Sequence, residues 1–223
     1  MSMHALCFLA GGESRRFGSP KVQMTINAQP VIEYLVDRVG DLFDAVWLSV
    51  ADANEQPPGV SACDRVIVDT ERFAGPLVAM SKVLDEAAKT ESLTYITFVA
   101  IDMPRVDLIL LERNHALVAG EPHKEKPSLI GGMGKWIDGP RCGAVEPLPS
   151  VWAIASASVF FRQMLVAGKR SLMALASQPG VATFPLGTAK DRSRYTNINR
   201  VEDGAAMSKL DIRVGSCARS SEK

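Results

Sequence analysis

The sequence is poor in cysteine and in the short motifs that mark common metal sites and nucleophilic enzymes. Its four cysteines are scattered through 223 residues and form no C-x-x-C pair, which argues against a structural zinc site and fits a reducing compartment. The three histidines fit no H-E-x-x-H motif, and no G-x-S-x-G motif is present. The sequence signatures of zinc proteases and of α/β-hydrolases are therefore missing.

An excess of charge of one sign is also missing. The chain has 25 Lys and Arg residues and 25 Asp and Glu residues, which argues against non-specific binding to nucleic acid or to a membrane surface. No stretch approaches a membrane span, and the apolar run at 5–10 is short for a signal peptide. We therefore expect a cytoplasmic protein that binds neither nucleic acid nor membranes, and any basic site has to be local.

Apolar runs and helical patterns alternate along the chain. The runs expected to form strands are 5–10, 45–50, 65–68, 95–101 and 181–185, with short strands near Leu129 and Val145. The segments expected to form helices start near Pro30 and Pro76 and span 106–118, 157–166, 171–176 and 201–210. This alternation predicts an α/β fold with a single doubly wound, mostly parallel sheet and helices on both faces.

The same pattern sets the expected domain and loops. We expect one domain over 1–214 and a disordered tail over 215–223, because the tail is small and polar. The glycines at 131–134 favour a hairpin turn, and 197–199 is expected to follow a short extended piece.

The stretch 9–21 follows the first apolar run and combines glycines with cations. Gly11 and Gly12 allow the backbone to turn and approach a ligand closely, and successive N–H groups in such a turn bind anions. Three cations follow within the same stretch, namely Arg15, Arg16 and Lys21. The stretch therefore predicts a phosphate-binding loop, although it matches neither the Walker A motif nor the G-x-G-x-x-G dinucleotide fingerprint.

This loop resembles the signature of the nucleotidyltransferases that build nucleotide-activated cofactors and sugars. Its form, Leu-Ala-Gly-Gly-x-Ser-x-Arg-Phe-Gly-x-x-Lys, is most similar to that of the molybdenum cofactor guanylyltransferases, whereas their cytidylyltransferase relatives usually read Leu-Ala-Ala-Gly. The resemblance implies that Leu9, Ala10, Gly11, Gly12 and Lys21 bind the nucleotide. It also implies that Arg16 and Lys21 stabilise charge on the triphosphate and on the departing pyrophosphate.

Asp102 stands at the end of the most strand-like run in the sequence. A carboxylate there could hold a divalent metal, or it could cap the helix that follows. The stretch 98–104 resembles the metal-binding Cys-Asp-Met-Pro element of the family, with Ile101 where Cys is usual. The resemblance implies that Asp102 is catalytic and binds both nucleotide and metal.

Asp69 ends the strand before the segment Gly75-Pro76-Leu77. This arrangement resembles the nucleotide-contacting element of the family, with Val78-Ala79 where Ala-Gly is usual, and it implies nucleotide contacts for Asp69 and Gly75. A helix N-terminus at Gly75 could present N–H groups to a base or phosphate. A plain turn with proline at the first helical position is the alternative.

Asn199 lies in a segment, 196–203, that resembles the Asn-x-Asn-Thr-Pro-Glu-Asp element of the family, with Arg200-Val201 where Thr-Pro is usual. The resemblance implies that Asn199 completes the metal site, and a helix cap is the alternative. The asparagine that the family has after its second strand has no clean match at 49–52. Four further cations could face an anionic acceptor or simply be solvated: Lys124, Lys126, Lys135 and Arg141.

Together, these elements imply transfer of GMP from Mg-GTP to the terminal phosphate of molybdopterin. The products would be pyrophosphate and molybdopterin guanine dinucleotide, Mg²⁺ would be the cofactor, and molybdoenzymes or cofactor-handover proteins would be partners. A transferase that uses CTP or another donor remains open, as does a non-catalytic nucleotide-binding protein. A dinucleotide-dependent oxidoreductase is disfavoured because its glycine fingerprint is missing.

Overall fold

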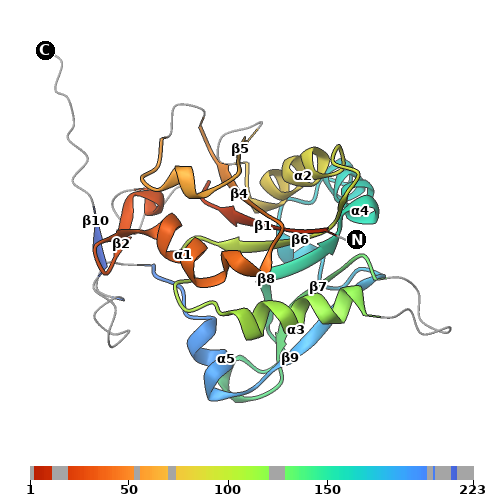
Figure 1. The fold of residues 1–223 in the computed structure, drawn as a ribbon. Helices are drawn as coiled ribbons and strands as arrows, with labels where there is room; N and C mark the ends of the chain where they lie inside the picture. The colour runs from red at the N-terminus through yellow and green to blue at the C-terminus, as the bar shows by residue number, and fades with distance from the viewer. Residues whose placement is uncertain are drawn as a thin grey trace, which may run out of the picture.

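A computed structural model describes residues 3–11, 20–52, 56–69, 74–120, 129–199, 203 and 212–214 (Figure 1). Within this part of the chain, the central sheet has seven strands in the order β5-β4-β1-β6-β8-β7-β9. Their bounds are β1 (Met3–Leu9), β4 (Ala45–Val50), β5 (Arg65–Val68), β6 (Leu93–Ala100), β7 (Gly131–Trp136), β8 (Val145–Ala153) and β9 (Val181–Leu186). All seven strands lie on or near the runs predicted from the sequence, with β7 and β8 at the short strands expected near Leu129 and Val145.

The sheet is mostly parallel, as predicted. The pairs β4–β5, β1–β4, β1–β6 and β7–β9 are parallel, whereas β8 runs antiparallel to both β6 and β7. The carboxyl ends of β5, β4, β1 and β6 consequently lie along one edge, where open α/β sheets bind their ligands. The predicted α/β class is confirmed.

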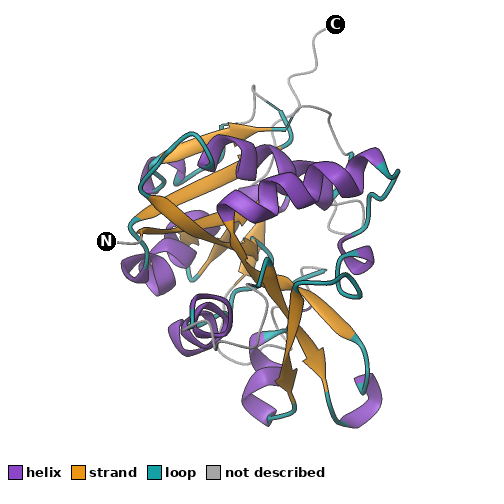
Figure 2. Cartoon of the chain, turned by 90° about the vertical axis from the view of Figure 1, so that its right-hand side faces the viewer, coloured by secondary structure: helices purple, strands orange, loops and turns teal. Residues whose placement is uncertain are grey.

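Helices cover both faces of this sheet (Figures 1 and 2). They are α1 (Val31–Val39), α2 (Pro76–Ala87), α3 (Leu108–Ala119), α4 (Ile154–Val166) and α5 (Ala189–Arg194). Short 3₁₀ segments are η1 (Lys21–Gln23), η2 (Gly40–Leu42), η3 (Val60–Ala62), η4 (Gly139–Arg141) and η5 (Leu172–Ala174). Within the described ranges, none of the helices is both long and apolar enough to cross a membrane.

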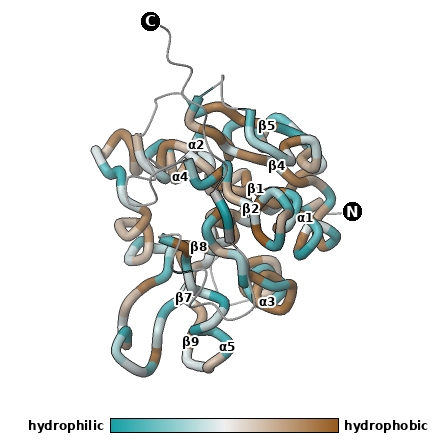
Figure 3. Tube along the Cα trace, turned by 90° about the vertical axis from the view of Figure 1, so that its left-hand side faces the viewer, coloured by the Kyte–Doolittle hydropathy of each residue, from teal (hydrophilic) through white to brown (hydrophobic). Residues whose placement is uncertain are grey.

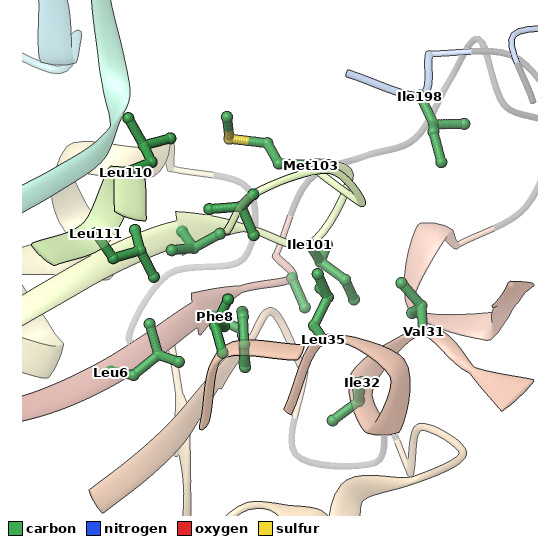
Figure 4. Close-up of a cluster of buried hydrophobic side chains, with 14 of the residues drawn as sticks. Leu6, Phe8, Val31, Ile32, Leu35, Ile101, Met103, Leu110, Leu111 and Ile198 are labelled. Carbon is green, nitrogen blue, oxygen red and sulfur yellow. The ribbon is translucent and has the colours of Figure 1, made fainter. Parts of the chain in front are cut away.

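Strand β1 shows how one sequence run supplies two cores. Leu6 and Phe8 pack with buried residues of α1 and α3 (Figure 4), whereas Ala5 and Cys7 pack with α2 and α4 on the opposite face. Side chains alternate between the two faces of a strand, so a strand covered on both faces is apolar throughout. The hydrophobic colour along much of β4 in Figure 3 reflects the same burial.

The prediction of a hairpin turn at 131–134 was wrong, because these residues form β7. The glycines serve packing instead of a turn: a Cβ on Gly131 would overlap the Trp152 ring, and one on Gly134 would lie 2.6 Å from Leu186. The chain reverses after β7, around η4. Large side chains on neighbouring strands therefore explain a glycine pattern that resembles a turn.

The segment before Asn197 is helical rather than extended. Thr188 and Asp191 form a reciprocal capping box that starts α5. The predicted helix at 171–176 is only the 3₁₀ turn η5. A small sheet was not predicted, and its strands in spatial order are β10 (Ile212–Val214), β2 (Met24–Ile26) and β3 (Gln29–Pro30). The expected helix at 201–210, apart from Asp203, and the expected tail at 215–223 lie outside the described residues.

Candidate active site

The carboxyl end of β1 carries the first predicted site residues, Leu9, Ala10 and Gly11. The N–H of Ala10 donates to the carbonyl of Ser49 at 2.9 Å, which continues the β1–β4 ladder by one step. A Cβ built on Gly11 would lie 2.8 Å from a carboxylate oxygen of Asp69. Glycine is therefore required here for close approach, and the structure brings the predicted residues Gly11 and Asp69 together.

Asp69 follows β5 and is held by the strand between it and β1. Its backbone N–H donates to the carbonyl of Val50 at 2.9 Å, and its Oδ1 accepts a hydrogen bond from Ser49 Oγ at 2.9 Å. Burial raises the pKa of Asp69, and the hydrogen bond from Ser49 partly offsets this rise. The carboxylate is thus a fixed acceptor beside the start of the glycine loop.

Ser49 is a site residue that sequence reasoning missed. It is fully buried within β4, whereas the family resemblance directs attention to an asparagine just beyond that strand. The available signal was a lone hydroxyl inside the apolar run Ala45–Val50. A buried hydroxyl needs a partner, and a neighbouring strand ending in a carboxylate can supply one.

Lys21, Asp102 and Asn199 form a second group on the same edge, although they are far apart in sequence. Lys21 Nζ lies 2.6 Å from Asp102 Oδ2 and 3.4 Å from Asn199 Oδ1. The side chains of Lys21 and Asp102 are 16% and 14% exposed. The structure therefore brings together the three residues that were expected to handle phosphate and metal.

Backbone hydrogen bonds tie this second group to the first. The N–H of Ile101 donates to the carbonyl of Leu9 at 3.2 Å, so Asp102 follows β6 directly beside the carboxyl end of β1. The N–H of Ile198 donates to the carbonyl of Asp102 at 2.8 Å, and Ile198 is fully buried. Figure 4 shows Ile198 and Ile101 in the same cluster of hydrophobic side chains. Asn199 is placed by this anchored segment.

Asp102 is not the cap of the helix that follows it. That cap is Asp107, whose Oδ1 accepts a hydrogen bond from the N–H of Leu110 at 3.0 Å. The alternative interpretation of Asp102 as a helix cap is therefore wrong. Its carboxylate contacts the ammonium of Lys21 instead.

The oxygens of this group suit a hard divalent cation. Within the described ranges, Asp102 Oδ1 is buried and has no hydrogen-bond partner, and an unpaired buried carboxylate oxygen is costly unless a ligand uses it. No cluster of three or more His, Cys, Asp or Glu side chains is found in that part of the chain. A metal here would rely on Asp102, on Asn199 and on oxygens of substrate and water, which is the pattern that Mg²⁺ favours.

Gly75 and Pro76 begin α2, as both interpretations of this segment required. Gly75 has φ of +101°, and a Cβ on it would lie 3.4 Å from the carbonyl oxygen of Arg170. Pro76 occupies the first turn, where its missing N–H costs nothing. The structure therefore confirms that α2 starts at this segment. It shows no contact between Gly75 and the other site residues among those described.

The remaining predicted residues are less informative. Gly12 and Arg16 lie outside the described residues, and so do Lys124 and Lys126. Lys135 is exposed on β7, and Arg141 forms an ion pair with Glu146. A partnered arginine favours a structural role for Arg141 over contact with an anionic acceptor.

Comparison with known proteins gives a consistent result. Residues 6–126 match the family model described as MobA-like NTP transferase domain. A protein of Cereibacter sphaeroides named molybdenum cofactor guanylyltransferase is 27% identical over 206 residues, which cover 91% of this chain and 94% of that protein. A protein of Opitutus terrae named probable molybdenum cofactor guanylyltransferase is 29% identical over 199 residues, which cover 87% and 90%.

Solved structures show the same fold. Molybdopterin-guanine dinucleotide biosynthesis protein A from Archaeoglobus fulgidus superposes with a TM-score of 0.63 at 19% identity, over 89% of this chain and 94% of that chain. A nucleotidyl transferase from Methanothermobacter gives a TM-score of 0.65 at 17% identity, over 93% and 96%.

Proposed function

Because this chain belongs to the MobA-like NTP transferase domain family, we propose that it transfers GMP from GTP to the terminal phosphate of molybdopterin. It is a nucleotidyltransferase by family, and its relatives over most of its length are named molybdenum cofactor guanylyltransferases. The products would be molybdopterin guanine dinucleotide and pyrophosphate. The choice of GTP and molybdopterin rests on those relatives and on Gly11 in the loop.

The nucleotide is proposed to lie along the edge where β5, β4, β1 and β6 end. Backbone N–H groups at Gly11 and Gly12 would receive the phosphates, as oriented amides do in other anion sites. Leu9 and Ala10 would line the nucleotide with the end of β1, since the N–H of Ala10 is already bonded to Ser49. Asp69 would accept hydrogen bonds from the donor nucleoside. The support is the 2.8 Å approach of Asp69 to the Cβ position of Gly11, which leaves the loop backbone and the carboxylate side by side.

The reacting phosphates are proposed to lie against Lys21, Asp102 and Asn199. Lys21, with Arg16 from the loop, would offset charge on the triphosphate and on the departing pyrophosphate. Asp102 and Asn199 would hold Mg²⁺, which neutralises phosphate charge when bound. A phosphate-monoester acceptor is already ionised near neutral pH, so positioning and charge neutralisation are the main requirements.

One observation carries this proposal. The ammonium of Lys21 lies within 2.6 Å of Asp102 and 3.4 Å of Asn199, although these residues are separated by 81 and 178 positions in the chain. A cation, a carboxylate and an amide oxygen at the carboxyl edge of a parallel sheet match the requirements of phosphoryl-type transfer. No general base is required, which agrees with the absence of a histidine or serine motif in the sequence.

The test is a turnover assay with purified protein, Mg²⁺ and molybdopterin, in which GTP, CTP and ATP are compared side by side. We expect pyrophosphate release and formation of the guanine dinucleotide with GTP, and much slower reaction with the other two. Faster reaction with CTP would assign the chain to cytidylyl transfer instead. No reaction with any of the three in the presence of molybdopterin would reject this acceptor.

A further inference from the structure

Lys21 occupies the position that a divalent cation needs. Its ammonium contacts Asp102 Oδ2 at 2.6 Å and approaches Asn199 Oδ1 at 3.4 Å. The other carboxylate oxygen, Oδ1 of Asp102, is buried and has no hydrogen-bond partner among the described residues. The ammonium therefore contacts two of the oxygens that suit a metal, and the third belongs to the same carboxylate.

A metal ion and this ammonium cannot both occupy that place. Mg²⁺ binds carboxylate oxygens at about 2.1 Å, which is closer than the ammonium already lies to Oδ2. A divalent cation on either oxygen of Asp102 would stand beside a positive charge in a site of restricted solvent access, where like charges repel strongly. Metal binding to the nucleotide-free protein is thus opposed until Lys21 moves.

The ammonium of Lys21 can change its partner while the backbone stays in place, because the side chain is long. Val22 is 1% exposed, and the N–H of Met24 donates to the carbonyl of Lys21, so η1 anchors the residue. The ammonium sits at the end of a flexible four-carbon stem. A triphosphate bound beside Gly11 would offer that ammonium a stronger anion than a single carboxylate.

We propose that Lys21 is a placeholder cation that keeps the divalent metal out of the site until a nucleotide binds. In the nucleotide-free protein it neutralises Asp102. When the triphosphate arrives, the ammonium turns to the phosphates and releases Asp102 to the metal, so metal and nucleotide bind together rather than metal first. This inference rests on the proposed function for the identity of the nucleotide.

The experiment measures Mn²⁺ binding directly, without turnover, from the electron paramagnetic resonance signal of free Mn²⁺. Wild-type protein is compared with Lys21→Met, Lys21→Arg, the double variant Lys21→Met/Asp102→Asn, and Lys190→Met. Lys190 is exposed on α5, so its substitution matches the change in net charge away from the site. Circular dichroism confirms that each variant is folded.

Without nucleotide, Lys21→Met is expected to bind one Mn²⁺ at least tenfold more tightly than wild type. Lys21→Arg and Lys190→Met should bind Mn²⁺ with the affinity of wild type. The double variant should not show the tighter binding of Lys21→Met. A GTP analogue with a methylene group between the α- and β-phosphates should tighten Mn²⁺ binding to wild type but add much less to Lys21→Met.

Equal Mn²⁺ affinity of wild type and Lys21→Met would overturn the proposal, as would an equal gain in Lys190→Met or in the double variant. These results are separable from the proposed function. If the protein binds Mn²⁺ as expected but forms no guanine dinucleotide, the placeholder role of Lys21 stands and guanylyl transfer is rejected. If it forms the dinucleotide but Lys21→Met binds Mn²⁺ no more tightly than wild type, guanylyl transfer stands and the placeholder role is rejected.

Discussion

The carboxylate of Asp69 lies 2.8 Å from the point that a Cβ on Gly11 would occupy. Real Cβ atoms do not approach oxygen so closely, so even alanine at this position has to displace Asp69 or the loop. Asp69 cannot move freely, because Ser49 holds its other oxygen. The first glycine of the loop is thus required by a residue from a strand two places away in the sheet.

Gly11→Ala is expected to weaken nucleotide binding more than it weakens the fold. A displaced carboxylate would cost about 1–2 kcal/mol of binding, or roughly a 5- to 30-fold rise in the dissociation constant. Calorimetric titration with GTP measures it. Gly11→Ala combined with Asp69→Ser, which shortens the obstructing side chain, should relieve the steric effect on stability, and unchanged GTP affinity in Gly11→Ala would contradict the role assigned to Asp69.

Asp69→Asn is expected to stabilise the protein while it impairs function. Burial raises the pKa of Asp69 above its ordinary value, so the folded state holds the proton more tightly than the unfolded state. The stability that the protonated carboxyl contributes to the fold is therefore complete below the unfolded pKa. It is lost as the pH rises through the folded pKa. Asparagine at position 69 keeps the shape of the side chain and an oxygen that accepts the hydrogen bond from Ser49, but it carries no negative charge.

The measurement for Asp69→Asn is urea unfolding across a range of pH. The variant should exceed wild type in free energy of unfolding at pH 7, and the difference should shrink as the pH falls toward 4. Its affinity for GTP should decrease. A variant less stable than wild type at pH 7 would show that the ionised carboxylate contributes more to the fold than its burial costs.

Lys21→Ala and Asp102→Ala are each expected to abolish turnover with little loss of fold. Removal of one preorganised charge from a phosphoryl-type site costs about 10²–10³-fold in kcat. Lys190→Ala, on the exposed face of α5, is the matched control and should retain wild-type rates. Pyrophosphate release gives the rate and urea unfolding the stability. Near-normal turnover in either site variant would remove its assigned role.

The sequence predicted the sheet because burial on both faces makes its parallel strands continuously apolar. The strands Ala45–Val50 and Arg65–Val68 have the expected bounds. The convergence of Lys21 and Asp102 was also predictable, since both follow strands or loops at one edge of a parallel sheet. The prediction that Asn199 binds the metal came only from the resemblance to a known family and stays a prediction, since local sequence patterns allow a helix cap instead.

What the sequence could not reveal depends on contacts between distant residues. The glycine pattern of β7 is typical of a turn, and only the positions of Trp152 and Leu186 in the folded protein show that these glycines make room for large side chains. Strands of two or three residues, such as β3 and β10, carry too little pattern to detect, and β10 pairs with β2 across most of the chain. Ser49 acquires a role only when its neighbour across the sheet is known to end in Asp69.

Asp191→Asn is expected to destabilise the protein by about 2 kcal/mol at pH 7, because a neutral amide loses the charge-assisted hydrogen bonds of a buried carboxylate. The Asp191 side chain is 1% exposed and accepts hydrogen bonds from Arg113, Gly187 N–H and Thr188 N–H. Burial acts to raise the pKa of Asp191, but the backbone hydrogen bonds and the charge of Arg113 outweigh it, so the pKa lies below its usual value.

The pH dependence of Asp191→Asn follows from that lowered pKa. The stability that the ionised carboxylate contributes is present above the unfolded pKa and is lost as the pH falls through the folded pKa. Urea unfolding should therefore show a large difference from wild type at pH 7 that narrows below pH 4. The control is Asp138→Asn, since the exposed Asp138–Arg192 pair should contribute less than about 1 kcal/mol. Equal effects of the two substitutions would contradict the prediction.

The stacked pair of His4 and His115 is expected to make the fold sensitive to mild acid. Their ring centroids lie 4.2 Å apart, and His4 Nε2 is hydrogen-bonded to Thr97 Oγ1 at 2.8 Å. Burial lowers the pKa of His4 to about 3, with a further contribution from His115 and an opposing one from Asp44. Burial also lowers the pKa of His115.

Both histidines are neutral in the folded protein at a pH where the unfolded chain takes up protons. Their contribution to stability is therefore complete above pH 6.5, the ordinary histidine value, and is lost progressively as the pH falls toward the folded pKa. His115→Phe keeps a ring against His4 and Tyr95 and removes one of the two proton-binding groups. Urea unfolding at pH 7.5, 6.0 and 5.0 should show a shallower loss of stability in this variant than in wild type. Parallel losses over that range would mean that His115 takes up its proton equally well in the folded chain and has no part in the acid sensitivity.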